Sequence, residues 1–86
     1  MARYEVLIKP SAVKDIEAIG TKKDRRRIIQ RIRSLADDPR PRGCEKLSGE
    51  DRYRIRQGRY RIVYALEDDR LVVYVVKVAH RRDIYR

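Results

Sequence analysis

Residues 52–64 read RYRIRQGRYRIVY, and this stretch decides the fold. Basic and apolar side chains alternate on both sides of Gln57-Gly58, which is the pattern of two strands that each turn one face toward a core. Gln57-Gly58 is predicted to form a two-residue hairpin turn in which Gly58 supplies a positive φ. The core side of the hairpin is assigned to Tyr53, Tyr60, Ile62 and Tyr64.

The other side of this hairpin is basic. With the predicted turn, Arg56 pairs with Arg59 and Arg54 pairs with Arg61, so four guanidinium groups share one face. Like charges in direct cross-strand pairs destabilise a hairpin, with each pair contributing about 0.2–1 kcal/mol. We therefore expect this face to receive an anion. The alternative is a solvated basic face above a core of tyrosine and isoleucine.

Length and charge narrow the class of protein. The 86 residues predict a single domain over residues 1–86, and the net charge of +10 predicts a polyanionic partner, nucleic acid first. With one cysteine and one histidine, the sequence offers no disulfide and no metal-ligand cluster, so neither a metal nor a cofactor is expected. No stretch is apolar enough to suggest a membrane span or a signal peptide, and a cytoplasmic location is expected.

The flanking segments predict the rest of the fold. Residues 3–9 alternate as a half-buried strand, and apolar residues at helical spacing predict two helices, over residues 11–20 and 22–36. Ser11 is the predicted N-cap of the first helix, and Thr21 or Asp24 is that of the second. Residues 39–50 have the composition of a loop, and residues 71–78 form an apolar strand with neighbours on both sides. The predicted fold is α+β in the order βααβββ. It is a curved, largely antiparallel four-stranded sheet with the N-terminal helical hairpin on one face and the arginines on the other.

Two motifs carry a resemblance to a known family. They are YRIRQGRYRIVY at residues 53–64 and VAHRRDIYR at residues 78–86, separated by an acidic turn and an apolar strand. The chain resembles the RelE-like toxins of the RelE/ParE superfamily over essentially its whole length. The resemblance implies a toxin of a type II toxin–antitoxin system that cuts mRNA in the ribosomal A site. It also implies a cognate antitoxin, which the charge of this chain predicts to be small, acidic or partly disordered.

The resemblance places individual residues. Arg54 and Arg56 stand where these toxins carry a basic pair on the first hairpin strand, and Arg61 stands at the arginine of the second strand. In the C-terminal motif, Arg81 and Tyr85 match the arginine and the near-terminal tyrosine of the family. The best-known members have lysines at the places of Arg54 and Arg56. Arginine is a poor proton acceptor because its pKa lies above about 12.

The implied chemistry is metal-independent attack of a ribose 2′-OH on the adjacent phosphate. A guanidinium group can donate two hydrogen bonds to the phosphate oxygens and so stabilise the negative charge that builds on the phosphorane. Arg61 and Arg81 are assigned to this role, and Arg56 assists them. Tyr85 is either a proton acceptor or a residue that stacks on a base. His80 is either a proton carrier or a structural residue. The residues assigned to RNA binding are Arg54, Arg52, Arg59, His80 and Arg82.

Two other functions fit the sequence. The ParE branch shares the fold but inhibits DNA gyrase by binding it, and here the run HRRDIY at residues 80–85 favours the RelE-like interpretation. The second alternative is a non-catalytic relative that binds RNA or an antitoxin, which the missing lysines suggest. Trapped gyrase–DNA complexes would identify the first, and RNA binding without cleavage on ribosomes would identify the second.

Overall fold

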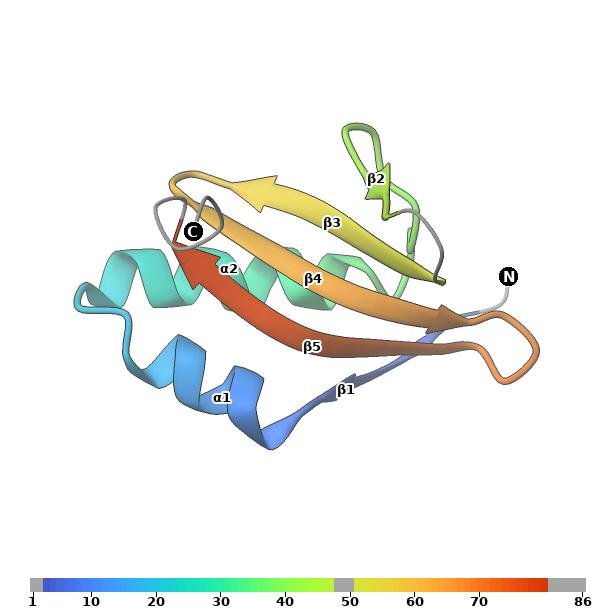
Figure 1. Ribbon diagram of the computed structural model, residues 1–86, viewed down its shortest axis with the longest axis horizontal. Coiled ribbons are helices and arrows are strands. Elements are labelled where there is room, and N and C mark those ends of the chain that lie inside the picture. The colour runs from blue at the N-terminus through green and yellow to red at the C-terminus, as the bar shows by residue number, and fades with distance from the viewer. Residues whose placement is uncertain (1–2, 48–50, 81–86) are drawn as a thin grey trace.

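The computed structural model describes residues 3–47 and 51–80, and Figure 1 shows how their helices and strands are arranged. The strands form one sheet in the order β1-β5-β4-β3-β2. Both helices lie on the same side of this sheet (Figure 1). In chain order the elements are β1 (Glu5–Ile8), α1 (Pro10–Glu17), α2 (Lys22–Ser34), β2 (Glu45–Lys46), β3 (Arg52–Gln57), β4 (Tyr60–Glu67) and β5 (Val72–His80).

The architecture confirms the predicted α+β fold with one additional strand. β1 pairs in parallel with β5, and every other pair of neighbours is antiparallel. β5 has a strand on each side, as its continuous apolar sequence predicted. The extra strand is β2, which lies at the sheet edge within the segment 39–50 that was predicted to be a loop. Its two residues are charged, so no apolar alternation marks it as a strand.

The two helices begin at positions with clear local causes. α1 starts with Pro10 in its first turn and Lys9 as its N-cap, so the prediction that Ser11 caps this helix is wrong. Proline suits that position because its φ is already helical and it has no N–H to leave unpaired. α2 starts after Thr21, whose Oγ1 accepts a hydrogen bond from the N–H of Asp24 at 3.3 Å, so Thr21 is the cap of the two that were predicted.

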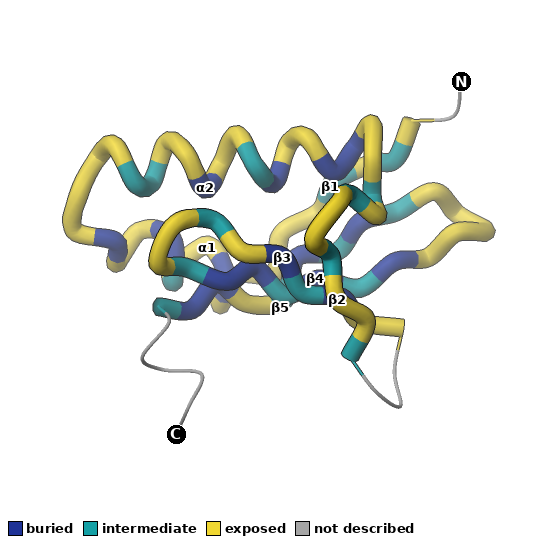
Figure 2. The backbone as a smooth tube through the Cα atoms, turned by 90° about the horizontal axis from the view of Figure 1, so that it is seen from above, coloured by how far each residue is buried: buried dark blue, intermediate teal, exposed yellow. Residues whose placement is uncertain are grey.

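The core lies between the helices and the sheet, and Figure 2 shows the buried positions of both layers. Tyr53, Ile62 and Tyr64 are buried there and Tyr60 packs against them, as the alternation in the hairpin predicted. Asp15 of α1 accepts a hydrogen bond from the N–H of Val78 at 3.1 Å, which ties α1 to the end of β5. The largest fully buried side chains are Tyr64, Ile28, Ile32, Leu35, Ile55, Ile62, Val73 and Val75.

The β3–β4 hairpin turns one residue later than predicted. Gln57 pairs with Tyr60, so the two turn residues are Gly58 and Arg59. Gly58 has a φ of 60°, whereas Arg59 has no positive φ. A glycine at the first central position followed by a residue with negative φ is the arrangement of a type II′ turn, whose twist matches that of the flanking strands.

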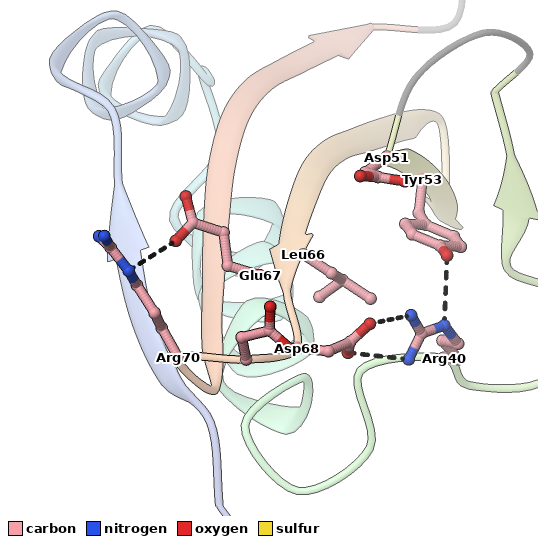
Figure 3. Close-up of a pocket in the computed structure, with 8 residues that line it drawn as sticks. Arg40, Asp51, Tyr53, Leu66, Glu67, Asp68 and Arg70 are labelled. Atoms are coloured by element: carbon pink, nitrogen blue, oxygen red, sulfur yellow. Dashed lines mark hydrogen bonds and ion pairs between the residues drawn. The ribbon is translucent and has the colours of Figure 1, made fainter.

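At the opposite end of the sheet, the carboxylate of Asp68 joins three segments, and Figure 3 shows its contact with Arg40. Asp68 in the β4–β5 turn accepts hydrogen bonds from Arg40 Nη1 at 3.2 Å and Nη2 at 2.7 Å, and from the Tyr4 hydroxyl at 2.6 Å. Arg40 also donates from Nε to the hydroxyl of Tyr53 at 3.3 Å. These bonds fasten the loop after α2 and the start of β1 to the β4–β5 turn. Arg40, Tyr53 and Asp68 line a pocket of about 460 Å³.

Asp68→Asn is expected to make stability less sensitive to acid. The hydrogen bonds from Arg40 and Tyr4 lower the pKa of Asp68 from 3.8 to about 2 in the folded protein. A depressed pKa gives stability that is complete above the unfolded value and is lost as pH falls toward the folded value. The melting temperature of the wild type should therefore fall more steeply than that of the variant between pH 3.8 and about 2. Asp69→Asn, which removes a neighbouring carboxylate of the same pocket, is the control. Parallel acid profiles for wild type and Asp68→Asn would contradict this role.

Within the described residues, no helix is both long enough and apolar enough to cross a membrane.

Candidate nucleic-acid interface

The sheet face turned away from the helices, called the outer face below, carries three clustered arginines. Arg56 and Arg61 stand directly opposite each other in the β3–β4 ladder, and Arg54 lies two residues along β3 on the same face. We call these three residues the arginine cluster. The predicted pairs Arg56–Arg59 and Arg54–Arg61 are wrong because the turn lies one residue later. One direct like-charge pair remains in place of two, and Arg59 occupies the turn.

A carboxylate from the edge strand stands beside the arginine cluster. Glu45 of β2 is the ladder partner of Arg54, and Arg54 Nη2 donates to Glu45 Oε2 at 2.8 Å. This hydrogen bond lowers the pKa of Glu45, and the charges of Arg61 and Arg56 lower it further. The positive charges of three arginines thus stabilise the ionised carboxylate of Glu45. Glu45 was not predicted as a site residue because no alternation in residues 39–50 places it on the sheet.

A buried tyrosine holds the loop that delivers Glu45 to this position. The hydroxyl of Tyr64 donates to the carbonyl oxygen of Pro39 at 2.8 Å and lies 3.5 Å from Cys44 Sγ. Burial, together with the hydrogen bond to Cys44, raises the pKa of Tyr64, so its hydroxyl remains a neutral donor. The segment from Pro39 to Cys44 is therefore anchored to the core immediately before β2 begins.

The two paired arginines differ in their surroundings. Arg61 is only 6% exposed, whereas Arg56 is exposed. An arginine donates two parallel hydrogen bonds to a phosphate and keeps its charge at every physiological pH. In a site shielded from water, such a charge stabilises an anion more strongly than it does at the surface. The pair can therefore hold a phosphate and stabilise added negative charge, but it cannot accept a proton.

β5 contributes one further cation to the outer face. Lys77 is exposed and stands opposite Val63, which lies two residues along β4 from Arg61 on the same face. Lys77 was not predicted as a site residue because it interrupts an otherwise apolar strand, and its face of the sheet follows only from the register with β4.

His80 lies on the opposite side of the sheet from the arginine cluster. It is on the same face as the buried Val78 and pairs with Tyr60, and the rings of His80 and Tyr60 meet edge to face with centroids 5.3 Å apart. It also lines a hollow with Asp15 and Ile19 of the helical layer. Strand alternation turns residue 80 toward the helices, and the assignment of His80 to RNA binding stays a prediction.

The remaining assigned residues fall into two groups. Arg52 lies on the outer face opposite Ala65, at the end of β3 farthest from the turn. Arg81, Arg82 and Tyr85 lie outside the described residues. In the part of the chain that the structure describes, no three His, Cys, Asp or Glu residues group in a way that could hold a metal ion.

Comparison with known proteins identifies the family. The model of the family described as the ParE toxin of the type II toxin–antitoxin system parDE matches residues 6–85. A search of curated proteins found no match.

Several solved toxins share the fold. An archaeal RelE in complex with RelB from Pyrococcus horikoshii is 29% identical with a TM-score of 0.79, and the match covers 94% of this chain and 97% of that chain. A mutant Escherichia coli RelE bound to an antitoxin RelBc peptide is 30% identical with a TM-score of 0.74, and the match covers 99% and 92% of the two chains. The RelBE2 complex of Mycobacterium tuberculosis, at 24% identity and a TM-score of 0.83 with 94% of each chain covered, shows the same fold.

The matched family model spans nearly the whole chain, and the hairpin that carries the arginine cluster belongs to a fold shared with solved RelE proteins. This chain therefore belongs to the RelE/ParE superfamily of toxins from type II toxin–antitoxin systems, and it is a RelE-like toxin.

Proposed function

We propose that this toxin is a ribosome-dependent endoribonuclease that cleaves mRNA in the ribosomal A site. The observation that supports the proposal is the arginine cluster, in which Arg56 stands directly opposite Arg61 and Arg54 lies on the same face. Membership in a toxin family supplies the biological class, and the guanidinium groups supply the phosphate chemistry. The ribosome and mRNA are then the partners of the toxin, and the cytoplasm is its place of action.

In the proposed reaction a ribose 2′-oxygen forms a bond to the adjacent phosphorus. The bond from phosphorus to the 5′-oxygen breaks, which leaves a 2′,3′-cyclic phosphate and a 5′-hydroxyl. The 2′-OH gives its proton to a base, and the leaving oxygen takes one from an acid. Arg61 and Arg56 donate hydrogen bonds to the non-bridging oxygens, where negative charge builds in the phosphorane. Because the reaction needs a 2′-OH, RNA is the substrate and DNA is not.

The residues outside the described part complete the proposed site. Arg81 adds a further guanidinium to the phosphorane, and Tyr85 either accepts the 2′-OH proton or stacks on a base. Arg54, which Glu45 already engages at 2.8 Å, contributes to RNA binding. Arg52, Arg59 and Arg82 are proposed to contact the RNA backbone, where they would add affinity that depends on salt.

A cognate antitoxin is the proposed protein partner. The solved toxins from Pyrococcus horikoshii and Methanococcus jannaschii are each in complex with RelB. The net charge of +10 on this chain favours an acidic, partly disordered segment that folds on binding. Co-purification from cells that express the natural operon should recover a small acidic protein. Recovery of the toxin alone would argue against this partner.

Inhibition of DNA gyrase is the second candidate, because the matching family model is the one named for the ParE toxin. In that case the outer face would bind a protein and the chain would not be an enzyme. Incubation of the toxin with gyrase and plasmid would then trap broken DNA. Trapped breaks together with intact mRNA would replace the first proposal with this one.

Expression of the toxin is expected to arrest growth and to produce new mRNA 5′ ends inside translated reading frames. Primer extension should place these ends at codons in the A site, and an mRNA without a start codon should remain intact. Arg56→Gln should weaken the signal, because it removes the exposed member of the opposed pair. Growth arrest with unchanged mRNA ends would exclude the endonuclease.

A further inference from the structure

A second basic surface lies between α2 and the tip of the β3–β4 hairpin. It consists of two adjoining hollows of about 320 and 310 Å³ that share Arg27 and Gln57 as lining residues. We call the two hollows together the helix groove. Three arginines line it, Arg27 and Arg31 from α2 and Arg59 from the turn, against a single carboxylate, that of Asp24.

The arginines of the helix groove make no ion pair within the described residues. Arg54, in contrast, is bonded to Glu45. Arg27 and Arg59 are exposed, and Arg31 is half-buried. Like charges lining one hollow repel each other, and the binding of an anion relieves that repulsion. The groove is therefore suited to a ligand that carries several negative charges.

The helix groove is continuous with the arginine cluster. A small hollow of about 30 Å³ at the hairpin tip is lined by Arg56 and Arg61 together with Gly58, Arg59 and Tyr60. The last three of these residues also line the helix groove. Because Arg59 occupies the turn, its guanidinium belongs to both hollows. A path of positive charge thus leads from the outer face, round the hairpin tip, to α2.

We propose that the helix groove binds the phosphate backbone of the single-stranded RNA that continues away from the arginine cluster. The inference rests on the proposed function, because it extends the RNA that occupies the cluster. An RNA strand fits better than an acidic peptide, because its phosphates recur at every nucleotide and the path begins at a phosphate site. Gln57, Gln30 and Ser34 in the same lining supply neutral polar groups for sugar and phosphate oxygens. Contacts of this kind add affinity that depends on salt and not on sequence.

RNAs of two lengths distinguish binding at the helix groove from binding at the arginine cluster, because only the longer RNA can reach both. Binding of labelled oligouridylates of about 4 and about 12 nucleotides to the full-length toxin is measured by fluorescence anisotropy over a range of salt concentrations. The double variant Arg27→Gln/Arg31→Gln tests the groove, because these two arginines line the helix groove and not the hollow at the hairpin tip. The control is Arg26→Gln/Arg33→Gln, which removes the same charge from exposed residues of α2 that line neither hollow. Melting temperatures establish that both double variants are folded.

The groove variant is expected to bind the longer RNA about 10-fold more weakly than the control. The slope of log affinity against log salt should fall in magnitude by about 1.4, since each phosphate contact with a single strand contributes about 0.7. The short RNA should bind both double variants equally. Equal binding of the longer RNA would overturn the inference, as would an equal loss for both lengths. Binding of a glutamate-rich peptide that depends on Arg27 and Arg31, while binding of the RNA does not, would overturn it too.

Failure of the proposed function would give a different result. In that case Arg56→Gln would leave binding of the short RNA unchanged, because no phosphate would occupy the arginine cluster. If Arg56→Gln weakens short-RNA binding and the groove variant matches its control, the cluster binds RNA and only the groove assignment is wrong.

Discussion

Replacing Arg61 with glutamine is expected to lower the rate of ribosome-dependent mRNA cleavage by about 100-fold to 1,000-fold, the usual loss when one donor to a developing oxyanion is removed. Arg61 is 6% exposed and stands opposite Arg56 in the ladder, so its charge is shielded from water yet lies on the outer face. Glutamine keeps part of the polar side chain but loses both the charge and the paired donors. The measurement is the rate of mRNA cleavage on programmed ribosomes with saturating toxin.

Two further variants separate the possible causes of that loss. Arg61→Lys keeps the positive charge but loses the paired N–H donors of the guanidinium group. An intermediate cleavage rate is expected if the charge and the paired donors both contribute. Arg33→Gln removes one charge from the exposed surface of α2 and should cleave at the wild-type rate. Because Arg61 is buried, the melting temperature must show that Arg61→Gln is folded. A folded Arg61→Gln with wild-type cleavage would exclude this residue from the chemistry.

Ile62→Ala is expected to reduce the free energy of unfolding by about 2–5 kcal/mol, the usual cost of a buried isoleucine-to-alanine change. Ile62 follows Arg61 in β4 but points to the other side of the sheet, where it is 0% exposed and stands between Ile55 and Val78. A small domain has a total stability of about 5–15 kcal/mol, so much of it would be lost. Urea unfolding followed by circular dichroism measures the change.

Val63→Ala is the matched control for this effect. Val63 is half-buried on the outer face, and its replacement should cost less because fewer contacts are removed and little or no cavity remains. Ile62→Ala should therefore lose toxicity through unfolding, whereas its neighbour Arg61→Gln loses toxicity while folded. If Ile62→Ala unfolds at the same urea concentration as Val63→Ala, the packing between the helices and the sheet is not the main source of stability.

Burial patterns explain why so much of the fold could be predicted. Tyr53, Ile62 and Tyr64 alternate with arginines, and a period of two residues is a local property of the chain. The apolar run in β5 likewise identified a strand with neighbours on both sides. The spacing of apolar residues predicted the helix α2, whose buried face includes Ile28 and Ile32. None of these inferences needed knowledge of a distant contact.

The candidate site could not be predicted to the same depth, because it depends on register and on contacts across the fold. Gly58 is compatible with either turn position, and the shift by one residue decides whether Arg61 faces Arg54 or Arg56. Glu45 reaches Arg54 through a two-residue strand that carries no periodicity. His80 was grouped with the arginines of the C-terminal motif although strand alternation turns it toward the helices.

The central claim is that the arginine cluster acts on an RNA phosphate, and single-turnover mRNA cleavage by saturating toxin on the ribosome tests it most directly. The variants compared are Arg56→Gln/Arg61→Gln and Arg26→Gln/Arg33→Gln, which remove equal charge from the outer face and from the exposed surface of α2. We predict that the first pair of substitutions abolishes cleavage in a folded protein and that the second preserves it. Equal cleavage by the two folded variants would contradict the account.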